Sequence, residues 1–208
     1  WPGYPIELRN SAGGGFRTRL TTGVKVFYVH SHNHEGSSFN MREANNWEVG
    51  YSAGWSVYST VNGGESADGL AGAGGTGGVV HDCFFAWCGD DGVDFITGSN
   101  MTCYNTIVYQ SGFFQGRIPH TGNGNGFKMS GVNSSTHNNL FYNCIAYDNR
   151  VVGFTCNTGS AKAYNCTAIK NHIGFTGNSS PNGVWGFKNC VGYNNTSNNY
   201  YPGNSTPA

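Results

Sequence analysis

The stretch FYNCIAYDN (Phe141–Asn149) recurs twice further along the chain. It returns as AYNCTAIKN at residues 163–171 and as FKNCVGYNN at residues 187–195, so the three cysteines lie 22 and 24 residues apart. Two earlier segments fit the same template: HDCFFAW at residues 81–87, and YNTIVY at residues 104–109, where Asn105 takes the cysteine position. Short β-rich runs that are joined by Gly- and Asn-rich turns at this period predict a solenoid.

The repeat favours an all-β fold, a right-handed parallel β-helix with about 22–24 residues in each coil. Leucine-rich repeats have a similar length, but their leucine spacing is missing here. In a β-helix, equivalent side chains stack coil upon coil, and a free thiol behaves as a small buried hydrophobe. We therefore expect an inward stack of four free thiols: Cys83, Cys144, Cys166 and Cys190.

Asparagines at the turns predict a second stack. Asn149 and Asn171 occupy equivalent turn positions, where stacked amides can hydrogen-bond to the turn backbone and to one another. Cys88 takes the same position in an earlier coil. We expect a ladder of asparagine side chains along this turn.

We expect one domain, residues 1–208, with less regular parts at its ends. Residues 1–22 lack clear periodicity and are expected to form an irregular lead-in or an incomplete first coil, and residues 196–208 a C-terminal tail. The first strand is expected at residues 24–29, and only residues 41–44 resemble a short helix. Residues 112–123 interrupt the repeat, which predicts an inserted loop on what is often the binding face of a solenoid.

The cysteine count leaves the oxidation state open. The chain has 7 cysteines, so at least one is free or paired between chains. The three outside the predicted thiol stack are the better disulfide candidates: Cys88, Cys103 and Cys156. Cys88 with Cys103 is the first pairing to consider.

Composition narrows the class of partner. Lys+Arg and Asp+Glu are both 11, and no run of basic residues occurs, so we expect no nucleic-acid partner. No apolar stretch reaches membrane-spanning length, so we expect no membrane partner. Polar uncharged residues mixed with Trp and Tyr suit contact with sugars, although they suit the polar surface of an all-β protein equally well.

Several N-glycosylation sequons agree with a secreted, extracellular protein that carries N-linked glycans. They begin at Asn100, Asn133, Asn165, Asn178, Asn194, Asn195 and Asn204. In a chain rich in asparagine some sequons arise by chance, so this support for secretion is weak.

Four carboxylates gather in a chain that has only 11 acidic residues. Asp68 lies in ADGLA, and Asp90, Asp91 and Asp94 lie in CGDDGVDF, 22 to 26 residues later. Positions one period apart in a parallel solenoid are about 4.8 Å apart, so these side chains should stack on neighbouring coils. Because like charges repel unless a cation neutralises them, and the donors are oxygens without a His/Cys set, we expect Ca²⁺. The alternative is that these are ordinary turn aspartates, an interpretation that suits Asp68 best.

The acidic blocks, the segment GNGFK at residues 124–128 and the repeat at residues 143–154 follow one another in order between about Gly63 and Asn195. In residues and spacing they resemble polysaccharide lyase family 9, which contains calcium-dependent pectate lyases on a right-handed parallel β-helix. The resemblance implies a Ca²⁺ site made by Asp68, Asp90, Asp91 and Asp94, with Lys128 as the Brønsted base. It also implies cleavage of an acidic polysaccharide, polygalacturonate (pectate), by β-elimination. The region before Gly63 shows little match, so N-terminal coils are expected to be missing or diverged.

Lys128 has the chemistry that this reaction needs. A base must remove the proton α to the C6 carboxylate of the sugar, and a lysine can do so only when it is neutral, so its pKa has to fall from about 10.4. A nearby cation and partial burial both disfavour the ammonium form. Lys128 is the only lysine between Lys25 and Lys162. The alternative is an ordinary solvated lysine.

Other polar residues give less specific hypotheses. Arg117, His120 and Arg150 could bind the carboxylates of the substrate, although structural roles account for them equally well.

Three histidines, His30, His32 and His34, alternate along one predicted strand and could form a metal trio. Polar turn histidines are the better interpretation.

Two other functions stay open. A catalytically silent β-helix could serve as a glycosylated structural, adhesive or filament-forming protein outside the cell, and an uncapped end could self-assemble. A carbohydrate-binding module with a structural Ca²⁺ is the third hypothesis. Lys128 together with the four aspartates favours the enzyme, because a scaffold needs no base beside its metal.

Overall fold

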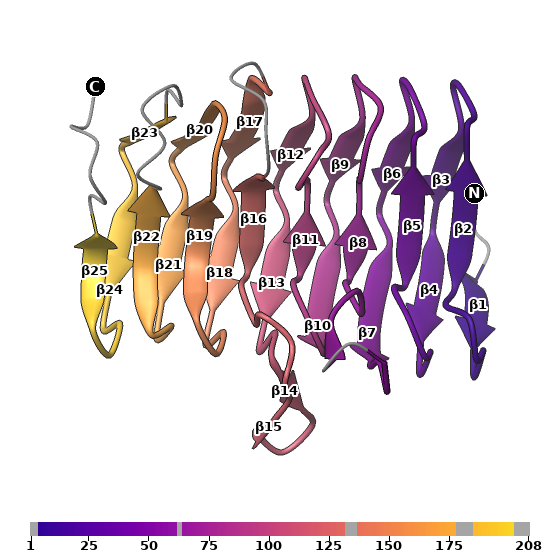
Figure 1. The fold of residues 1–208 in the computed structure, drawn as a ribbon, viewed down its shortest axis with the longest axis horizontal. Helices are drawn as coiled ribbons and strands as arrows, with labels where there is room; N and C mark the ends of the chain where they lie inside the picture. The colour runs from indigo at the N-terminus through magenta and orange to yellow at the C-terminus, as the bar shows by residue number, and fades with distance from the viewer. Residues whose placement is uncertain (1–3, 62–63, 132–136, 178–184, 202–208) are drawn as a thin grey trace.

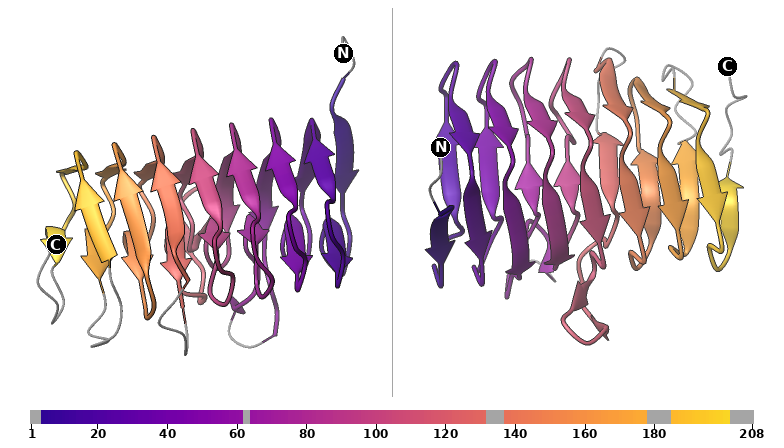
Figure 2. Two further views of the ribbon diagram at one scale, coloured as in Figure 1. Left: turned by 90° about the horizontal axis from the view of Figure 1, so that it is seen from above. Right: turned by 180° about the vertical axis from the view of Figure 1, so that it is seen from behind.

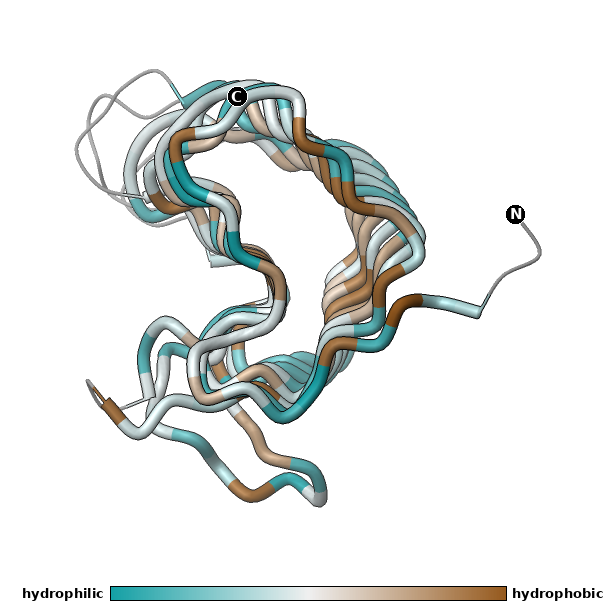
Figure 3. Tube along the Cα trace, turned by 90° about the vertical axis from the view of Figure 1, so that its right-hand side faces the viewer, coloured by the Kyte–Doolittle hydropathy of each residue, from teal (hydrophilic) through white to brown (hydrophobic). Residues whose placement is uncertain are grey.

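The computed structural model describes residues 4–61, 64–131, 137–177 and 185–201, and it shows a parallel β-helix built from three long sheets (Figure 1). Each coil gives one strand to each sheet, and the strands of consecutive coils pair in parallel. Seen along the axis, the coils superimpose, with one hairpin and several loops projecting from the tube (Figure 3). The expected all-β, right-handed parallel β-helix is confirmed.

The strands are grouped by sheet as follows. Sheet A has eight strands in the order β1 (Ile6–Arg9), β4 (Val29–His32), β7 (Ala53–Val57), β10 (Phe84–Cys88), β13 (Ile107–Tyr109), β18 (Ile145–Tyr147), β21 (Thr167–Ile169) and β24 (Val191–Tyr193). Sheet B has eight strands in the order β2 (Phe16–Arg19), β5 (Phe39–Arg42), β8 (Leu70–Ala71), β11 (Val93–Asp94), β16 (Phe127–Ser130), β19 (Val152–Cys156), β22 (Ile173–Gly177) and β25 (Asn198–Tyr201). Sheet C has seven strands in the order β3 (Lys25–Phe27), β6 (Glu48–Gly50), β9 (Val79–His81), β12 (Thr102–Tyr104), β17 (Asn139–Tyr142), β20 (Ala161–Tyr164) and β23 (Trp185–Lys188).

The core is a set of columns in which one inward position repeats from coil to coil. In sheet B, the rings of Phe127, Phe154 and Phe175 are stacked at centroid distances of 4.7 and 5.0 Å and are fully buried. The alternation of inward and outward side chains along a strand places their neighbours on the outer face. The outer face of sheet B is therefore a polar row, and this row carries the site described below.

Bends between the sheets depend on residues with positive φ. Between sheets C and A the bend residue is an asparagine in four coils, with φ between 49° and 54°: Asn105, Asn143, Asn165 and Asn189. Asparagine tolerates this left-handed conformation better than most residues. The repeat that was read from the sequence is thus the record of one sharp bend per coil (Figure 2).

The predicted asparagine ladder is confirmed. The amide nitrogen Nδ2 of Asn149 donates to Oδ1 of Asn171 at 2.9 Å, and Nδ2 of Asn171 donates to Oδ1 of Asn195 at 3.1 Å. The backbone nitrogen of Ser111 continues the ladder by donating to Oδ1 of Asn149 at 2.9 Å. Each buried turn amide is thereby satisfied by a side chain of the next coil.

The thiol stack also forms, with one shift of register. Cys83, Cys144 and Cys166 are buried, and Cys190 is half-buried. In the coil between them the equivalent residue is Thr106 and not Asn105, because Ile107 pairs with Ile145. Asparagine and the following small residue form a fixed pair at this bend, and the sequence reading was one residue out.

The expected disulfide is wrong. All seven cysteines are free thiols. Cys88 lies in β10 of sheet A and Cys103 in β12 of sheet C, so the two belong to different walls of the helix. Cys103 instead approaches the thiol stack, with its Sγ 3.9 Å from Sγ of Cys144.

The ends of the chain are more regular than the sequence suggested. Strands β1 and β2 lie within the expected lead-in of residues 1–22 and pair with β4 and β5, so this part forms a coil. The residues expected to form one strand, 24–29, divide between β3 and β4 around the bend at Tyr28, and residues 41–42 of the helix candidate belong to β5. β25 lies within the expected tail of residues 196–208. The first coils have few cysteines and asparagines at the bends, so their period was hidden.

The inserted loop at residues 112–123 holds an antiparallel hairpin, β14 (Phe113–Phe114) and β15 (Ile118–Pro119). It projects from the body of the helix beside β10 and β13 (Figure 1). Within the described residues, no helix is long and apolar enough to cross a membrane.

Candidate metal centre and active site

Four polar residues occupy the same position in consecutive coils, immediately before the strands of sheet B. They are Ser37, Asp68, Asp91 and Asn125, and we call them the polar ladder. In each step the side chain accepts a hydrogen bond from the backbone nitrogen one coil later: Asp68 N to Ser37 Oγ at 3.3 Å, Asp91 N to Asp68 Oδ1 at 3.2 Å, and Asn125 N to Asp91 Oδ1 at 2.9 Å. This arrangement resembles the asparagine ladder, but two of its rungs carry a negative charge.

Three residues further along the strands, a second row faces outward. In this row Asp94 pairs with Ala71 in β8 and with Lys128 in β16. Nζ of Lys128 lies 3.4 Å from Oδ2 of Asp94 and 3.0 Å from Oδ2 of Asp91, so it bridges the two rows. Oδ1 of Asp94 accepts a hydrogen bond from the nitrogen of Ile96 at 2.7 Å, which fixes the carboxylate.

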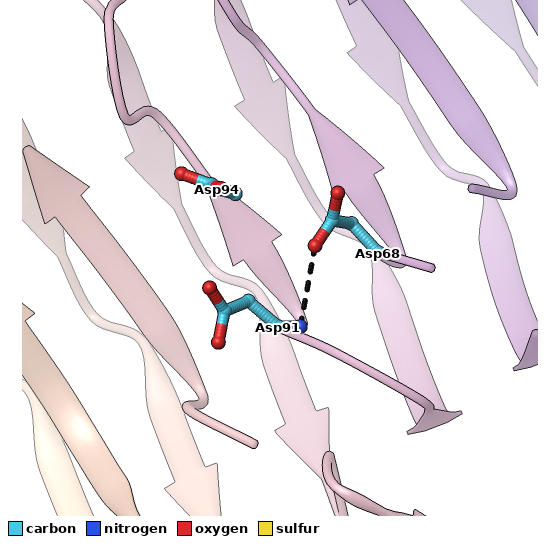
Figure 4. Close-up of side chains that lie close together, drawn as sticks. All are labelled: Asp68, Asp91 and Asp94. Carbon is cyan, nitrogen blue, oxygen red and sulfur yellow. Dashed lines mark hydrogen bonds between the residues drawn. The ribbon is translucent and has the colours of Figure 1, made fainter. Parts of the chain in front are cut away.

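The two rows bring three aspartates together. Asp68, Asp91 and Asp94 come from neighbouring coils of sheet B, and their side chains lie around a common space (Figure 4). One carboxylate oxygen from each lies within 4.8 Å of the others. Among the described residues, no other group of three acidic, histidine or cysteine side chains is drawn together in this way. We call these residues the aspartate triad.

Burial makes the aspartate triad electrostatically costly. Burial, and then the repulsion of Asp94 and its neighbours, raises the pKa of Asp68 well above its ordinary value. Burial likewise raises the pKa of Asp91, and it raises the pKa of Asp94 to about 7, although the Lys128 ammonium acts in the opposite direction. A cation bound among the carboxylates would relieve this penalty.

The same carboxylates control Lys128, whose residue is 6% exposed. Burial alone would lower the pKa of its amine, but the carboxylates of Asp94 and Asp91 outweigh burial and raise the pKa. Without a metal the site therefore holds an ammonium. The fall in pKa that the sequence argument required depends on neutralising these two carboxylates.

The aspartate triad fits a calcium ion. Oxygen ligands bind Ca²⁺ at about 2.3–2.6 Å, so two ligands of one ion can lie up to roughly 5 Å apart. The separations within the triad meet this condition. The donors are hard oxygens, with no thiol or imidazole among them, which suits Ca²⁺ and not zinc.

Asp90 differs from the other three predicted ligands. Its Oδ2 accepts a hydrogen bond from the nitrogen of Ser66 at 2.8 Å, and its Oδ1 accepts one from the nitrogen of Asn123 at 2.6 Å. Asp90 thus joins the loop before β8 to the segment after the hairpin, at the edge of the same cleft. A role of Asp90 as a metal ligand stays a prediction.

A cleft of about 600 Å³ lies over this part of sheet B. Lys128, Asp68, Asp90 and Asp94 line one end of it, and Asn40, Arg42 and Glu43 line the part over earlier coils. A polymer several sugars long suits such an elongated polar cleft better than a small apolar ligand. Arg42 is the cation that the sequence argument missed, because its coil shows little of the repeat.

The three residues predicted to bind substrate lie elsewhere. The guanidinium of Arg117 binds the carboxylate of Asp148, and that of Arg150 binds the carbonyl oxygen of Gly122. His120 is buried, with its ring centroid 4.7 Å from that of Phe114, and burial lowers its pKa. All three contacts fix the hairpin and the segment that follows it, and none of the three lines the cleft.

The three alternating histidines are not a metal trio. His34 is buried and hydrogen-bonds to Ser31 Oγ at 3.1 Å, whereas His32 pairs with Glu7 at 2.9 Å and stacks on Trp55. Their contacts are local and structural, in agreement with the preferred interpretation of the sequence.

Sequence reasoning also missed two residues that position the triad. Asn125 holds Asp91 through both its backbone nitrogen and its Nδ2, each 2.9 Å from Oδ1 of Asp91. Ser37 Oγ lies 3.3 Å from Oδ2 of Asp68. Asn125 stands in the quoted segment GNGFK, three residues before Lys128, and the same spacing separates Asp91 from Asp94. This parallel was the signal that could have revealed its role.

A buried acidic centre with a lysine on the outer face of a parallel β-helix defines the class: a solenoid whose fold is shared with polysaccharide lyases. The chain belongs to the Pel9A-like right-handed β-helix family, whose description matches residues 4–205. This confirms the resemblance to polysaccharide lyase family 9.

Two solved structures are similar to it. The crystal structure of pectate lyase Pel9A superimposes with a TM-score of 0.74 at 21% identity, over 95% of this chain and 52% of that one. A rhamnogalacturonan lyase superimposes with a TM-score of 0.57 at 16% identity, over 99% of this chain and 62% of that one. The chain thus spans little more than half the length of these proteins. A comparison with curated protein sequences gives no match.

Proposed function

We propose that this protein is a calcium-dependent polysaccharide lyase that cleaves polygalacturonate by β-elimination, with Lys128 as the base. The observation that carries the proposal is the position of Lys128, a buried lysine beside the aspartate triad and at the floor of an open cleft. Lysine is rarely buried unless it is paired or functional. The proposal assigns metal binding to Asp68, Asp91 and Asp94, with Asp90 at the edge of the same site.

The bound Ca²⁺ would supply positive charge that holds the C6 carboxylate of a galacturonate residue and makes the neighbouring C5–H more acidic. Asp91 and Asp94 have a second task, because their charge decides whether Lys128 is an ammonium or an amine. Once their charge is neutralised, burial favours the neutral amine.

Lys128 then acts on the sugar directly. Its neutral amine accepts the proton from C5, the electron pair of the C5–H bond forms the C4=C5 double bond, and the C4–O bond breaks. The leaving oxygen takes a proton from water, so the products are a shortened chain with a free hydroxyl and an unsaturated uronate. The amine needs only to lie within hydrogen-bond reach of that proton in the bound complex.

The two relatives support this choice of reaction class. One is titled a pectate lyase and the other a rhamnogalacturonan lyase, and pectic polymers are common to both names. We further propose that the protein acts outside the cell. Three of its sequon asparagines, Asn100, Asn165 and Asn194, are exposed, so N-linked glycans could be attached there without disturbing the core.

The test is the ultraviolet absorbance of unsaturated uronate released from polygalacturonate. We expect product with Ca²⁺, none after chelation, and none from Lys128→Ala. Lys188→Ala is the matched control, because Lys188 is an exposed lysine in β23, far from the cleft. Product from Lys128→Ala at the rate of the unaltered protein would refute the assigned base. Folded, Ca²⁺-loaded protein that releases no product would instead favour the non-catalytic extracellular scaffold.

A further inference from the structure

A second pocket lies at the bend between sheets A and B, beneath the β14–β15 hairpin. Its volume is about 430 Å³, which is in the range of sites for small ligands. Three aromatic and three polar uncharged residues line it: Tyr58, Trp87, Phe114, Asn33, Ser56 and Gln115. We call it the hairpin pocket. None of its lining residues belongs to the cleft over the aspartate triad.

The hairpin is fixed firmly enough to form one wall. On one side Nε2 of Gln115 donates to Oγ of Ser56 at 2.9 Å, which joins the hairpin to a coil 59 residues earlier. On the other side Arg117 binds the carboxylate of Asp148 and lies over the ring of Phe113, 5.1 Å from its centroid. Phe114, between these two anchors, is 40% exposed and lines the pocket.

Trp87 is unusual for its position in the coil. Register places it opposite Ser56 in the previous coil and Gln110 in the next, at the bend where φ is positive. Across the coils this bend is otherwise occupied by polar side chains: Asn10, Asn33, Ser56, Gln110, Asp148, Lys170 and Asn194. A bulky residue at φ 50° is a conformational outlier, and such strain concentrates at functional sites.

The orientation of the Trp87 ring is also fixed. Its Nε1 donates to Oε1 of Gln110 at 2.8 Å, so the indole is held at the pocket while half of the side chain stays accessible. Tyr58 is 38% exposed on the same pocket. Rigid aromatic side chains with accessible surface are effective binding groups because they lose little entropy on binding.

We propose that the hairpin pocket binds a neutral sugar residue of a polysaccharide. Aromatic rings offer apolar faces to the C–H face of a pyranose, and the amides of Asn33 and Gln115 can hydrogen-bond to its hydroxyl groups. None of the lining residues is charged. A uronate carboxylate would lose hydration there without gaining a partner, so the pocket should favour uncharged sugars.

The hairpin pocket adjoins the metal centre along the chain. Trp87 precedes Asp90 by three residues, and the segment that leaves the hairpin reaches Asn123, whose nitrogen binds Asp90. One polymer could therefore present a uronate to the cleft and a neutral residue to the pocket. Binding of the neutral sugar does not depend on the proposed lyase activity.

The test is calorimetric titration of the full chain with a neutral 1,4-linked galactan oligosaccharide, in the presence of chelator. An oligogalacturonate of equal length is the charged comparison. We expect the galactan oligosaccharide to bind at least about tenfold more tightly than the oligogalacturonate. Trp87→Asn removes the ring and places a residue that tolerates positive φ, and Phe114→Ala shortens the opposite wall. Each should weaken galactan binding about tenfold.

Tyr51→Ala is the control, because Tyr51 is an aromatic residue that is 51% exposed and stacks on Tyr28, outside the pocket. Its binding should equal that of the unaltered protein. Absence of galactan binding would overturn the proposal, as would unchanged affinity in both pocket variants. Lys128→Ala should bind galactan normally, so a failure of the lyase hypothesis would leave this result intact.

Discussion

Asp68 and Asp91 occupy the same place in consecutive coils, and Oδ1 of Asp68 accepts a hydrogen bond from the backbone nitrogen of Asp91 at 3.2 Å. The contact belongs to the backbone architecture, as in the asparagine ladder. It leaves other carboxylate oxygens of the pair to face Asp94 (Figure 4). One residue type therefore closes the coil and collects negative charge.

Asp91→Asn should separate these two tasks. The amide oxygen can still accept the hydrogen bond from the nitrogen of Asn125, so the coil should stay intact, whereas the lost charge should weaken Ca²⁺ binding by about tenfold or more. Calorimetric titration with Ca²⁺ measures the effect. Asp82→Asn is the control, since Asp82 lies at a bend between sheets C and A. Equal Ca²⁺ affinity in Asp91→Asn would remove Asp91 from the metal centre.

The metal-free protein should lose stability as pH rises through about 7. The folded pKa of Asp94 is raised to about 7, above its ordinary value of 3.8, so the folded chain holds a proton that the unfolded chain releases. That contribution is fully present below pH 3.8 and is lost as the pH rises through about 7. Urea denaturation at a series of pH values in chelator would detect it.

Calcium and Asp94→Asn should both flatten this profile. A bound cation favours the ionised carboxylates, and the amide of the variant does not titrate at all. A metal-free profile that rises steadily between pH 4 and 7 would contradict the repulsion assigned to the aspartate triad.

Asn171→Ala should destabilise the fold by about 1–3 kcal/mol. Asn171 is fully buried, and its Oδ1 accepts hydrogen bonds from the backbone nitrogen and from Nδ2 of Asn149, both at 2.9 Å. Alanine leaves these donors without a partner inside the helix. The urea midpoint measures the loss, and Asn198→Ala, at an exposed position of β25, should leave the midpoint nearly unchanged.

All seven thiols should react with a thiol reagent after unfolding without reductant. In the native protein the reaction should be slow, because six of them are buried and burial raises the pKa of Cys83 to about 12. Cys190, which is half-buried, should react first. Fewer than seven reactive thiols in the unfolded chain would show a disulfide that the structure lacks.

The second half of the fold was readable because its bends repeat the same residues. Asn143 and Cys144 return as Asn165 and Cys166, and both positions have one physical task, a left-handed bend and a small buried side chain. The first coils solve the same problem with Tyr28 and Tyr51, which are not typical bend residues. Their strands could not be found from the pattern, although the register is the same.

The site followed a similar division. Asp91, Asp94 and Lys128 were found because their spacing matched the coil and their charges are rare in this chain. Arg117 and Arg150 were placed near the substrate because of their chemistry alone, and chemistry does not determine which way a side chain points from a hairpin. Their actual partners, Asp148 and the carbonyl oxygen of Gly122, depend on loop geometry that no periodicity encodes.

The hairpin has a further consequence for the way such proteins diversify. Ala71 and Asp94 are 23 residues apart, and Asp94 and Lys128 are 34 residues apart, yet both pairs are adjacent in sheet B. The extra residues leave the tube and return to it without altering the distance between the reacting groups. Evolution is thus free to lengthen, shorten or replace this excursion, and so to change which polymers are recognised, while the chemical centre keeps its dimensions.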